Sequence, residues 1–348
     1  MPSRKITLLI PGLLGPDNVK HTPGALDNLD LNELALMLSR GQGSVSAYDF
    51  VSSLFNQFEI TRQPDQDWPV AALTALTDLD EGRADVVSSS LFRADPVHLK
   101  ADRDRVVMFG NRHLNVTLDE SNQLAQEFNQ LFAEDGVKLL TPKPTRWYLA
   151  INQSPRITTT ELSLTIGQDI HPLLPQGEDG LYWHRLLNEA QMLFHTSRVN
   201  QRREAQGLPM INSVWLWGGG RLPAAKALSW QGVWSNESLA GALASYHSIE
   251  TGSAPASAED WLEQVDGGDH LVVLDGVTDV VQFEDIGRWR DFIEAVSQEW
   301  IAPLITALKE GTVEQVTLET GQGERYRLTA KQLRRWWRRA KPIATFLR

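Results

Sequence analysis

The sequence predicts an α/β protein whose core sheet is interrupted by a smaller, inserted α+β domain. The chain has 348 residues, which is too long for one compact core and suits two domains. An apolar run, Lys5–Ile10, ends at Pro11-Gly12 and is followed by leucines near the helical period, and a strand followed by a helix is typical of α/β proteins. A second apolar run, His270–Gly276, is bounded by glycines and predicts a buried strand.

The stretch that follows residue 90 predicts the small α+β domain. Thr117 and Glu120 form a capping-box pattern, which marks the start of a helix. Alternating or apolar segments on both sides of this helix predict short strands. In chain order the predicted pieces are two strands within Leu91–Phe109 joined at Ala101–Arg103, a helix over Thr117–Phe132, and strands at Val137–Leu140 and Trp147–Ile151. We therefore predict residues 91–211 as the inserted domain and residues 1–90 and 212–348 as the core.

Hydrophobic periodicity and glycine positions predict further elements. They are an amphipathic segment at Tyr48–Phe58, helices at Val70–Leu79, Leu181–Phe194 and Trp289–Leu308, a strand at Asn212–Gly220 that ends in three glycines, and a hairpin of Val313–Leu318 and Glu324–Leu328.

Composition and charge exclude several classes of protein. The chain has no cysteine, so it has no disulfide, no thiol nucleophile and no thiolate metal site. A net charge of −11 argues against general affinity for nucleic acid. The apolar runs are too short to span a bilayer or to form the core of a signal peptide. We therefore expect a cytoplasmic protein with no membrane span.

Two features in the middle of the chain could bind an anion. The glycine turn at Gly218, Gly219 and Gly220 can offer backbone amides to a phosphate. No P-loop or GxGxxG motif is present, and close backbone packing is the favoured interpretation. Arginine side chains bind carboxylate or phosphate through paired hydrogen bonds, but surface placement is the favoured interpretation of this set. The arginines are Arg93, Arg146, Arg198, Arg202 and Arg203.

Signatures of catalysis are few. The eight histidines form no HxxxH or HxH pair, whereas a hydrolytic site with two metals needs several imidazoles near carboxylates. No GxSxG elbow is present, and Ser88–Ser90 is interpreted as a turn. The aspartates Asp275, Asp279 and Asp285 could ligate a hard cation, but solvated turns are favoured. We therefore assign no catalytic residue and no metal ligand.

The segment RRWWRR, residues 334–339, interleaves basic and aromatic side chains. On a helix, Leu333, Trp336, Trp337 and Ala340 would cover one side, and the arginines the other. Such a helix can bind a nucleic acid or an anionic surface. The favoured alternative is a docked helix whose tryptophans belong to the core and whose arginines complement the acidic body.

Five phrases between Leu91 and Gly220 follow one another in the order of a known family. They are LFRADPVHLK, TLDESNQLAQEFNQLF, GVKLLTPKPTRWYLAI, GQDIHPLLPQG and LLNEAQMLFHTSRVNQRREAQGLPMINSVWLWGGG. In these phrases the chain resembles the cofactor-independent phosphoglycerate mutases of the archaeal type. The resemblance implies an alkaline-phosphatase-like core with two divalent metals and a serine nucleophile, and an inserted domain whose arginines contact the phosphoglycerate.

The same resemblance places the candidate contacts to a substrate or anion. One arginine opens the insert, a second precedes a strand, and the others belong to the V-N-basic phrase that leads to the glycines. The candidates are Arg93, Arg146, Asn200, Arg202, Arg203, Gly218, Gly219 and Gly220.

The core departs from the family where the family's chemistry lies. A metal-binding Asp-Gly is replaced by Pro11-Gly12, and the loop that should hold the serine, Gln63–Pro69, contains neither serine nor threonine. A later Asp and His correspond to Thr278 and Gln282, with Asp279 one residue away. The family's C-terminal Asp-His loop has no counterpart. Losing the nucleophile and most ligands together removes the covalent step and its charge neutralisation.

We therefore predict a pseudoenzyme: a non-catalytic homologue that acts as a regulatory protein or binds a phosphorylated small molecule, with no cofactor. The chain looks like a member of a bacterial branch of the family that is described as regulatory. One alternative is an active mutase or phosphatase with relocated ligands for manganese or magnesium. Another is an interaction protein that binds a protein partner through residues 331–348, nucleic acid being disfavoured.

Overall fold

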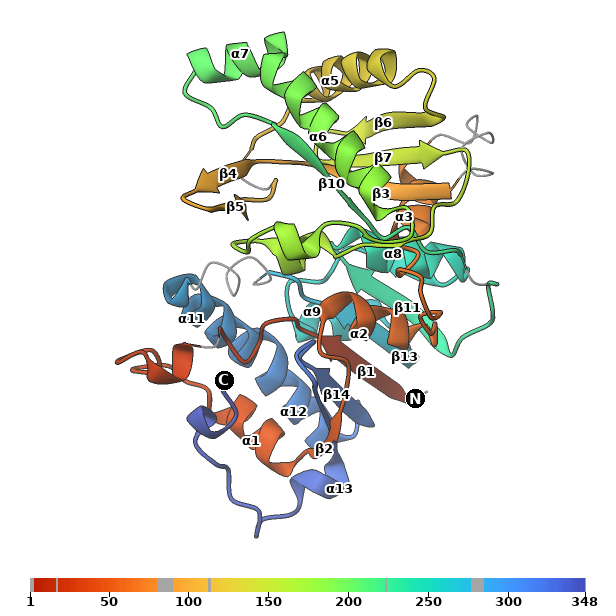
Figure 1. Ribbon diagram of the computed structural model, residues 1–348. Helices are drawn as coiled ribbons and strands as arrows, with labels where there is room; N and C mark the ends of the chain where they lie inside the picture. The colour runs from red at the N-terminus through yellow and green to blue at the C-terminus, as the bar shows by residue number, and fades with distance from the viewer. Residues whose placement is uncertain are drawn as a thin grey trace. The chain divides into compact units, whose positions relative to one another are not determined.

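The structure is a computed structural model that describes residues 3–16, 18–79, 90–111, 114–222, 224–276 and 285–347. Its mixed α/β fold confirms the predicted fold class (Figure 1). The chain divides into two compact units, a core unit of Met1–Thr61 and Ala225–Arg348 and a middle unit of Arg62–Ala224. The domain boundaries expected at residues 91 and 211 lie inside the middle unit, which also includes the helix before residue 90.

A seven-stranded mixed sheet forms the centre of the core unit. Its order is β12-β11-β13-β1-β14-β15-β2; the first five strands are parallel and the last two pairings are antiparallel. The two apolar runs predicted for the core pair directly, with Leu9 opposite Val273, which confirms that prediction. The strands are β1 (Arg4–Leu9), β2 (Gln42–Val45), β11 (Trp230–Ser235), β12 (Glu250–Gly252), β13 (Gly268–Val273), β14 (Gln315–Glu319) and β15 (Glu324–Thr329).

Most helices of the core unit contribute to one apolar cluster with the sheet. Ile6, Leu8 and Val272 from the sheet join Trp289 and Leu304 from helices in that cluster, and burial of such side chains is the main stabilising contribution. The helices are α1 (Asn32–Arg40), α2 (Phe50–Gln57), α8 (Ser238–Tyr246), α9 (Ala258–Gln264), α11 (Ile286–Ala295), α12 (Ala302–Glu310) and α13 (Ala330–Leu333); of these, α1, α9, α11, α12 and α13 contribute to the cluster.

The long helix predicted at Trp289–Leu308 is present but contains a wider turn. A π-helical segment, Val296–Ile301, joins α11 to α12. Pro303 lies in the first turn of α12. Because proline has no N–H, it cannot make the α-helical hydrogen bond to the preceding turn, and the π-helical segment accommodates this loss.

The prediction of a helix for RRWWRR, residues 334–339, is wrong. Helix α13 ends at Leu333, and Trp336 and Trp337 are 79% and 64% exposed rather than part of the core. The guanidinium of Arg40 donates to the carbonyl of Leu333 at 2.5 Å and to that of Arg338 at 3.1 Å. These side-chain bonds take up carbonyls that a continued helix would use, so the chain turns instead.

A buried histidine lies in the core sheet at His270. Its Nδ1 accepts a hydrogen bond from Nε1 of Trp234 at 3.3 Å. Because Nδ1 accepts, Nε2 carries the proton and donates to the carbonyl of Gly267 at 2.8 Å. Burial lowers the pKa of His270 from its usual value of 6.5, because desolvation disfavours the charged imidazolium.

We predict that His270 makes the protein less stable in mild acid. Between the pKa of 6.5 in the unfolded chain and the lowered pKa in the folded chain, the unfolded chain binds more protons at this residue. The free energy of unfolding therefore falls by up to about 1.4 kcal/mol per pH unit as the pH falls through this window. Urea unfolding measured at several pH values should show that the difference in free energy of unfolding between the wild type and His270→Gln changes over this pH window. The matched change His21→Gln, at an exposed histidine, should leave the dependence on pH in place. An unaltered slope in His270→Gln contradicts the prediction.

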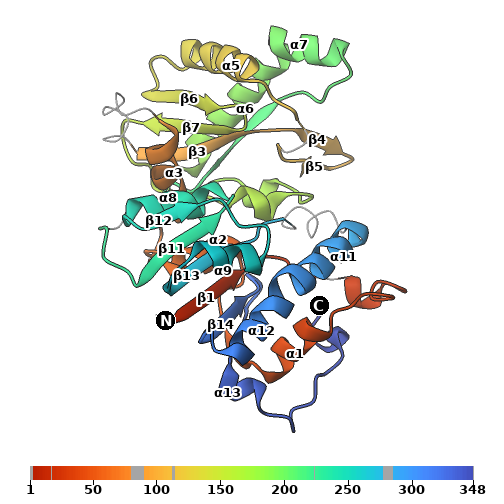
Figure 2. The ribbon, with the colours of Figure 1, turned by 180° about the vertical axis from the view of Figure 1, so that it is seen from behind.

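The middle unit is a four-stranded antiparallel sheet, β10-β3-β7-β6, with helices on both faces (Figure 2). Neighbouring residues of a strand point to opposite faces. Phe92 therefore packs with α5 and α6, and Leu91 with α3. The strands are β3 (Ser90–Val97), β4 (Leu99–Asp102), β5 (Arg105–Met108), β6 (Val137–Lys143), β7 (Arg146–Ile151), β8 (Ile157–Thr158), β9 (Gln176–Gly177) and β10 (Ser213–Trp217). The helices are α3 (Val70–Asp78), α5 (Leu118–Leu131), α6 (Gly180–Thr196) and α7 (Arg198–Ala205).

Local signals in the middle unit are mostly confirmed. Thr117 and Glu120 form the predicted capping box at the start of α5. The turn predicted at Ala101–Arg103 lies between β4 and β5, where Arg103 has a φ of +58°. The single strand expected before this turn is instead two, because β3 ends at Val97 and β4 begins at Leu99. None of the described helices is long and apolar enough to cross a membrane.

Candidate functional site

The stretch Val199–Gly220 contains α7, a loop, β10 and the glycine turn. Asn200 lies near the start of this stretch, and its side chain is fully buried. Its Nδ2 donates to the carbonyls of Phe194 at 2.7 Å and Ile211 at 2.8 Å, and its Oδ1 accepts from the amide of Ile211 at 2.8 Å. The Asn200 side chain thus joins the end of α6 to the loop before β10 and faces the protein's own backbone.

Arg203 is 1% exposed and also bonds within the middle unit. Its Nε donates to the carbonyl of Pro209 at 2.8 Å, Nη1 to Oε1 of Glu120 at 2.9 Å, and Nη2 to the carbonyl of Leu114. Burial alone would raise the pKa of Glu120, but the amide of Thr117 and the guanidinium of Arg203 outweigh it and hold that pKa below its usual range. This geometry favours a structural role for Arg203. Arg202 is exposed and donates to Gln123 at 2.7 Å.

Replacing Arg203 should strongly destabilise the middle unit. In Arg203→Met the apolar volume is kept, while the Glu120 carboxylate and two carbonyls lose their donor. We expect the free energy of unfolding to fall by about 3 kcal/mol, the scale of breaking a buried ion pair. The control Arg202→Met removes an exposed arginine one residue away and should change the free energy by about 0.5 kcal/mol or less. Urea unfolding followed by circular dichroism measures both, and equal effects contradict the prediction.

Arg93 and Asp95 form a buried ion pair on β3. They lie two residues apart and hence on one face of the sheet. Nε and Nη2 of Arg93 donate to Oδ1 of Asp95 at 3.1 and 2.6 Å. The guanidinium also lies over the rings of Tyr148 and Trp217, 5.6 and 5.2 Å from their centroids. Surface placement, the favoured interpretation of the arginines, is therefore wrong for Arg93 and Arg203.

Arg146 pairs with Asp78 at the end of α3. Its Nη2 donates to Oδ1 of Asp78 at 2.7 Å, and the hydroxyl of Tyr148 donates to Oδ2 at 2.7 Å. Burial raises the pKa of the Tyr148 hydroxyl, so it keeps the proton that it donates. Lys143 lies 3.4 Å from the same carboxylate. The group ties α3 to β7, so the charge of Arg146 is already matched within the protein.

The three glycines pack against neighbouring backbone and side chains. Gly218 has a φ of +69° and accepts a hydrogen bond at its carbonyl from the amide of Ala71 at 2.9 Å. A Cβ on Gly219 would lie 2.2 Å from the ring of Phe92, and one on Gly220 would lie 2.0 Å from the carbonyl oxygen of Asp67. Only glycine fits at such a close approach. The packing interpretation of the turn therefore has direct support.

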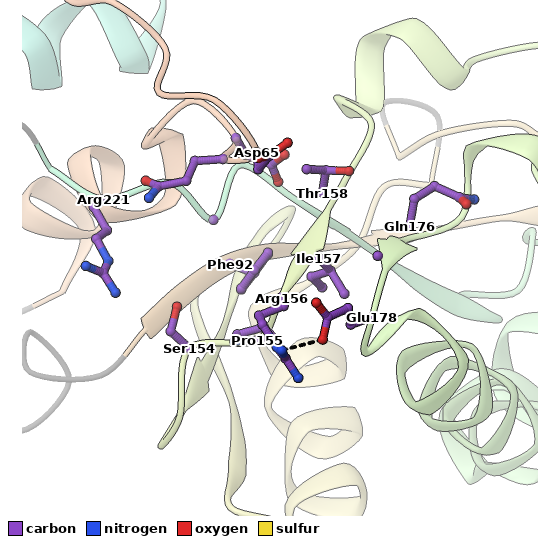
Figure 3. A pocket seen from close by; sticks show the side chains of 14 residues that line it. Asp65, Phe92, Ser154, Pro155, Arg156, Ile157, Thr158, Gln176, Glu178 and Arg221 are labelled. Carbon is purple, nitrogen blue, oxygen red and sulfur yellow. Dashed lines mark ion pairs between the residues drawn. The ribbon is translucent and has the colours of Figure 1, made fainter.

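A pocket of about 550 Å³ lies beside this turn, wholly within the middle unit (Figure 3). Three segments surround it: the loop before α3, the turn after β10, and the short ribbon of β8 and β9. The residues that line it are Asp65, Gln66, Asp67, Phe92, Ser154, Pro155, Arg156, Ile157, Thr158, Gln176, Gly177, Glu178, Gly219 and Arg221. Of the candidate contacts named from the sequence, the pocket includes Gly219.

The charged side chains that line the pocket differ in whether they have a partner among the described residues. Arg156 pairs with Glu178. Arg221 stands apart from this pair in Figure 3, is exposed, and has no ion-pair or hydrogen-bond partner in the described part of the chain. Asp67 accepts hydrogen bonds from the amide of Thr159 at 3.0 Å, from the Thr159 hydroxyl and from the amide of Gly219. Burial nevertheless outweighs these bonds and raises the pKa of Asp67 above 3.8.

The carboxyl ends of the parallel strands are the usual ligand site of an open α/β sheet. In the core unit Glu319 ends β14 there with a fully buried side chain. Ser46 and Gln57 donate to its carboxylate. Arg325 donates to Oε2 through Nη2 at 2.9 Å and through Nε at 3.2 Å. The negative charge of Glu319 is thus matched by a guanidinium of the same unit.

The positions compared with the family's metal ligands are only partly described. Pro11 follows β1, and its Cα would lie 3.3 Å from a Cβ on Gly321. Thr278, Asp279 and Gln282 lie outside the described residues, as do Ser88 and Ser89. Asp285 caps α11, accepting from the amide of Arg288 at 3.1 Å. Over the described ranges, no three His, Asp or Glu side chains gather as a metal-binding group.

Comparison with known proteins gives two partial matches in sequence. The chain is 33% identical over 57 residues to the 2,3-bisphosphoglycerate-independent phosphoglycerate mutase of Methanosarcina mazei, covering 16% of this chain and 14% of that protein. It is 27% identical over 143 residues to a probable enzyme of the same name from Geobacter sulfurreducens, covering 41% of this chain and 35% of the relative. The chain resembles the cofactor-independent phosphoglycerate mutases. The matched segments span well under half of these relatives, and no family model matches the chain.

The fold of most of the chain has a counterpart among solved structures. A protein of Pyrococcus horikoshii aligns over 94% of this chain and 88% of its own, with a TM-score of 0.54 and 11% identity. The phosphoglycerate mutase of Thermoplasma acidophilum aligns over 99% and 94%, with a TM-score of 0.48 and 16% identity. The Pyrococcus match shows a shared fold, while the regulatory bacterial branch of the phosphoglycerate mutases stays a prediction.

Sequence reasoning singled out the loop Gln63–Pro69 but missed the other polar residues that line the pocket. Arg221 directly follows the three glycines, and this adjacency could have identified it. Gln176 lies in β9 and Arg156 and Glu178 flank the β8–β9 ribbon, and none of them belongs to a recognisable motif. They meet Asp67 only because the β8–β9 ribbon folds beside the loop before α3.

Proposed function

We propose that the chain is a non-catalytic relative of the phosphoglycerate mutases that binds a phosphorylated small molecule in the pocket beside Gly219. The observation that carries the proposal is the guanidinium of Arg221 at that pocket, which has no ion-pair or hydrogen-bond partner among the described residues. An arginine fork offers parallel N–H donors that match phosphate oxygens. Three of the arginines named from the sequence, Arg93, Arg146 and Arg203, are already bonded to carboxylates or carbonyls.

The remaining lining groups favour a ligand that also carries hydroxyl groups. Asp65, Gln176 and Thr158 line the pocket and can accept hydrogen bonds from hydroxyls. The volume of about 550 Å³ is in the range of small-molecule sites. Phosphoglycerate, the compound in the names of the matched relatives, has both a phosphate and a hydroxyl group. It is the first ligand to test.

The non-catalytic part of the proposal rests on the core unit. Pro11-Gly12 follows β1 where the family has a metal-binding aspartate, and the loop Gln63–Pro69 offers no serine or threonine hydroxyl. Arg325 binds the buried Glu319 carboxylate at the carboxyl end of the sheet. A nucleophile and a charge-neutralising metal act together in phosphoryl transfer. We therefore expect binding without turnover.

Binding should depend on Arg221. Titration calorimetry with 3-phosphoglycerate should give saturable binding to the wild type, and Arg221→Gln should weaken it about tenfold or more, because a charged hydrogen-bond donor is lost. Arg185→Gln is the matched control, since Arg185 is an exposed arginine of the same unit outside the pocket. Arg202→Gln tests the contact predicted from the sequence. If Arg202→Gln loses binding while Arg221→Gln binds like the wild type, the ligand does not bind in the pocket beside Gly219.

Turnover is tested on the same protein. Incubation with 3-phosphoglycerate and manganese should give neither 2-phosphoglycerate nor inorganic phosphate. Formation of either product at a rate proportional to protein concentration, and unchanged between independent preparations, overturns the non-catalytic proposal. That outcome would favour the active mutase or phosphatase with relocated ligands.

Affinity should rise as the pH falls toward the raised pKa of Asp67. The ionised carboxylate opposes a bound anion, and protonation above pH 3.8 removes this repulsion earlier than for an ordinary aspartate. Asp67→Asn keeps an oxygen acceptor for Thr159 and should bind more tightly at neutral pH. The ratio of the two dissociation constants, which cancels the titration of the ligand's own phosphate, should approach one as the pH is lowered. A constant ratio contradicts a role for Asp67 in the electrostatics of binding.

A further inference from the structure

The segment Lys331–Lys341 presents a cluster of cations and aromatic rings, which we call the basic tryptophan loop. Figure 1 shows the chain after α13 as an irregular trace rather than a helix. Trp336 and Trp337 project from it with exposed fractions of 79% and 64%. Its cationic residues are Lys331, Arg334, Arg335, Arg338, Arg339 and Lys341, and it has no acidic residue.

The basic tryptophan loop is held in place at both ends. On one side Arg40 donates to the carbonyls of Leu333 and Arg338. On the other the amide of Lys341 donates to Oγ of Ser39 at 2.8 Å, and Leu347 is buried in the core cluster. The exposed tryptophans are therefore presented by an anchored loop. They do not belong to a frayed chain end.

Within the described ranges, the protein itself does not use the cations of this loop. Among the described residues, none of these arginine and lysine side chains has an ion-pair or hydrogen-bond partner. This is unexpected on a chain of net charge −11, where carboxylates are plentiful. Unpaired guanidinium groups around an apolar centre suit a partner that is itself anionic. The shared chemistry of such a partner is phosphate beside an apolar region.

The arrangement of the two rings favours a lipid surface over a nucleic acid as the partner. The indoles of Trp336 and Trp337 have centroids 6.1 Å apart and planes at 84°. Successive bases of a single strand stack as parallel planes, whereas these two rings are nearly perpendicular and offer no common stacking platform. Indoles in the headgroup region of a bilayer need no common plane, and arginines there contact lipid phosphates.

We propose that the basic tryptophan loop docks on an anionic lipid surface. Trp336 and Trp337 enter the headgroup region, and the surrounding arginines contact lipid phosphates. Each basic residue near such a surface strengthens binding about fivefold at low salt. The contact is peripheral, because the apolar part comprises two side chains and no membrane-spanning helix.

Vesicle flotation with the full chain tests this proposal. Vesicles of phosphatidylcholine and phosphatidylserine at 7:3 should carry the wild type upward, and pure phosphatidylcholine should carry little. Trp336→Ser/Trp337→Ser and Arg338→Ser/Arg339→Ser should each lower the partition coefficient about tenfold or more. Raising the salt to 1 M, where the Debye length is about 3 Å, should release the protein.

Matched controls separate the loop from general charge and apolarity. Lys138→Ser/Arg185→Ser removes two exposed cations elsewhere, and Leu181→Ser removes an exposed apolar side chain; both should float like the wild type. Equal binding to neutral and anionic vesicles, or wild-type binding by the double tryptophan variant, overturns the proposal. So does tighter binding to a single-stranded oligonucleotide than to the vesicles. Self-association that the loop variants abolish, without flotation, would identify a second copy as the partner.

Discussion

The pocket of the middle unit depends on one close approach of backbone to backbone. Gly220 lies against the carbonyl of Asp67 so tightly that a Cβ would be 2.0 Å from that oxygen. The contact brings the loop before α3 onto the turn after β10, and the neighbouring bond between Ala71 and Gly218 continues it. Arg221 is directed to the pocket because it follows immediately in the chain. A side chain at Gly220 would therefore displace both walls at once.

Much of the fold could be predicted from local sequence patterns, because many of its helices and strands are specified by interactions between residues close in sequence. The capping box at Thr117 and the apolar runs of β7 and β1 each specify an element through neighbouring residues alone. The strand β11 and helix α8 carry weaker signals, since α8 is rich in alanine and glycine and is stabilised by packing. The end of α13 depends on Arg40, nearly three hundred residues away, and no local pattern could reveal it.

The candidate site shows a different balance. The glycine turn was identified from the sequence and lines the pocket through Gly219. Most of the arginines selected with it make structural hydrogen bonds within the protein. A guanidinium has several donors and can bind distant carbonyls as well as it binds phosphate. Which of these uses applies depends on burial and on the position of acceptors such as Glu120 and Asp95. Both are properties of the tertiary fold.

The pairing of Glu319 with Arg325 also has a consequence for how the sheet edge meets its surroundings. A counterion that belongs to the same chain has a fixed local concentration and is not removed by dilution or by a chelator. The two residues face each other across neighbouring antiparallel strands, Glu319 opposite Arg325 in the register of β14 and β15. Folding of the hairpin and neutralisation of the carboxylate are therefore a single event. The charge of the Glu319 carboxylate is therefore neutralised by the fold itself and does not depend on ions in the cell.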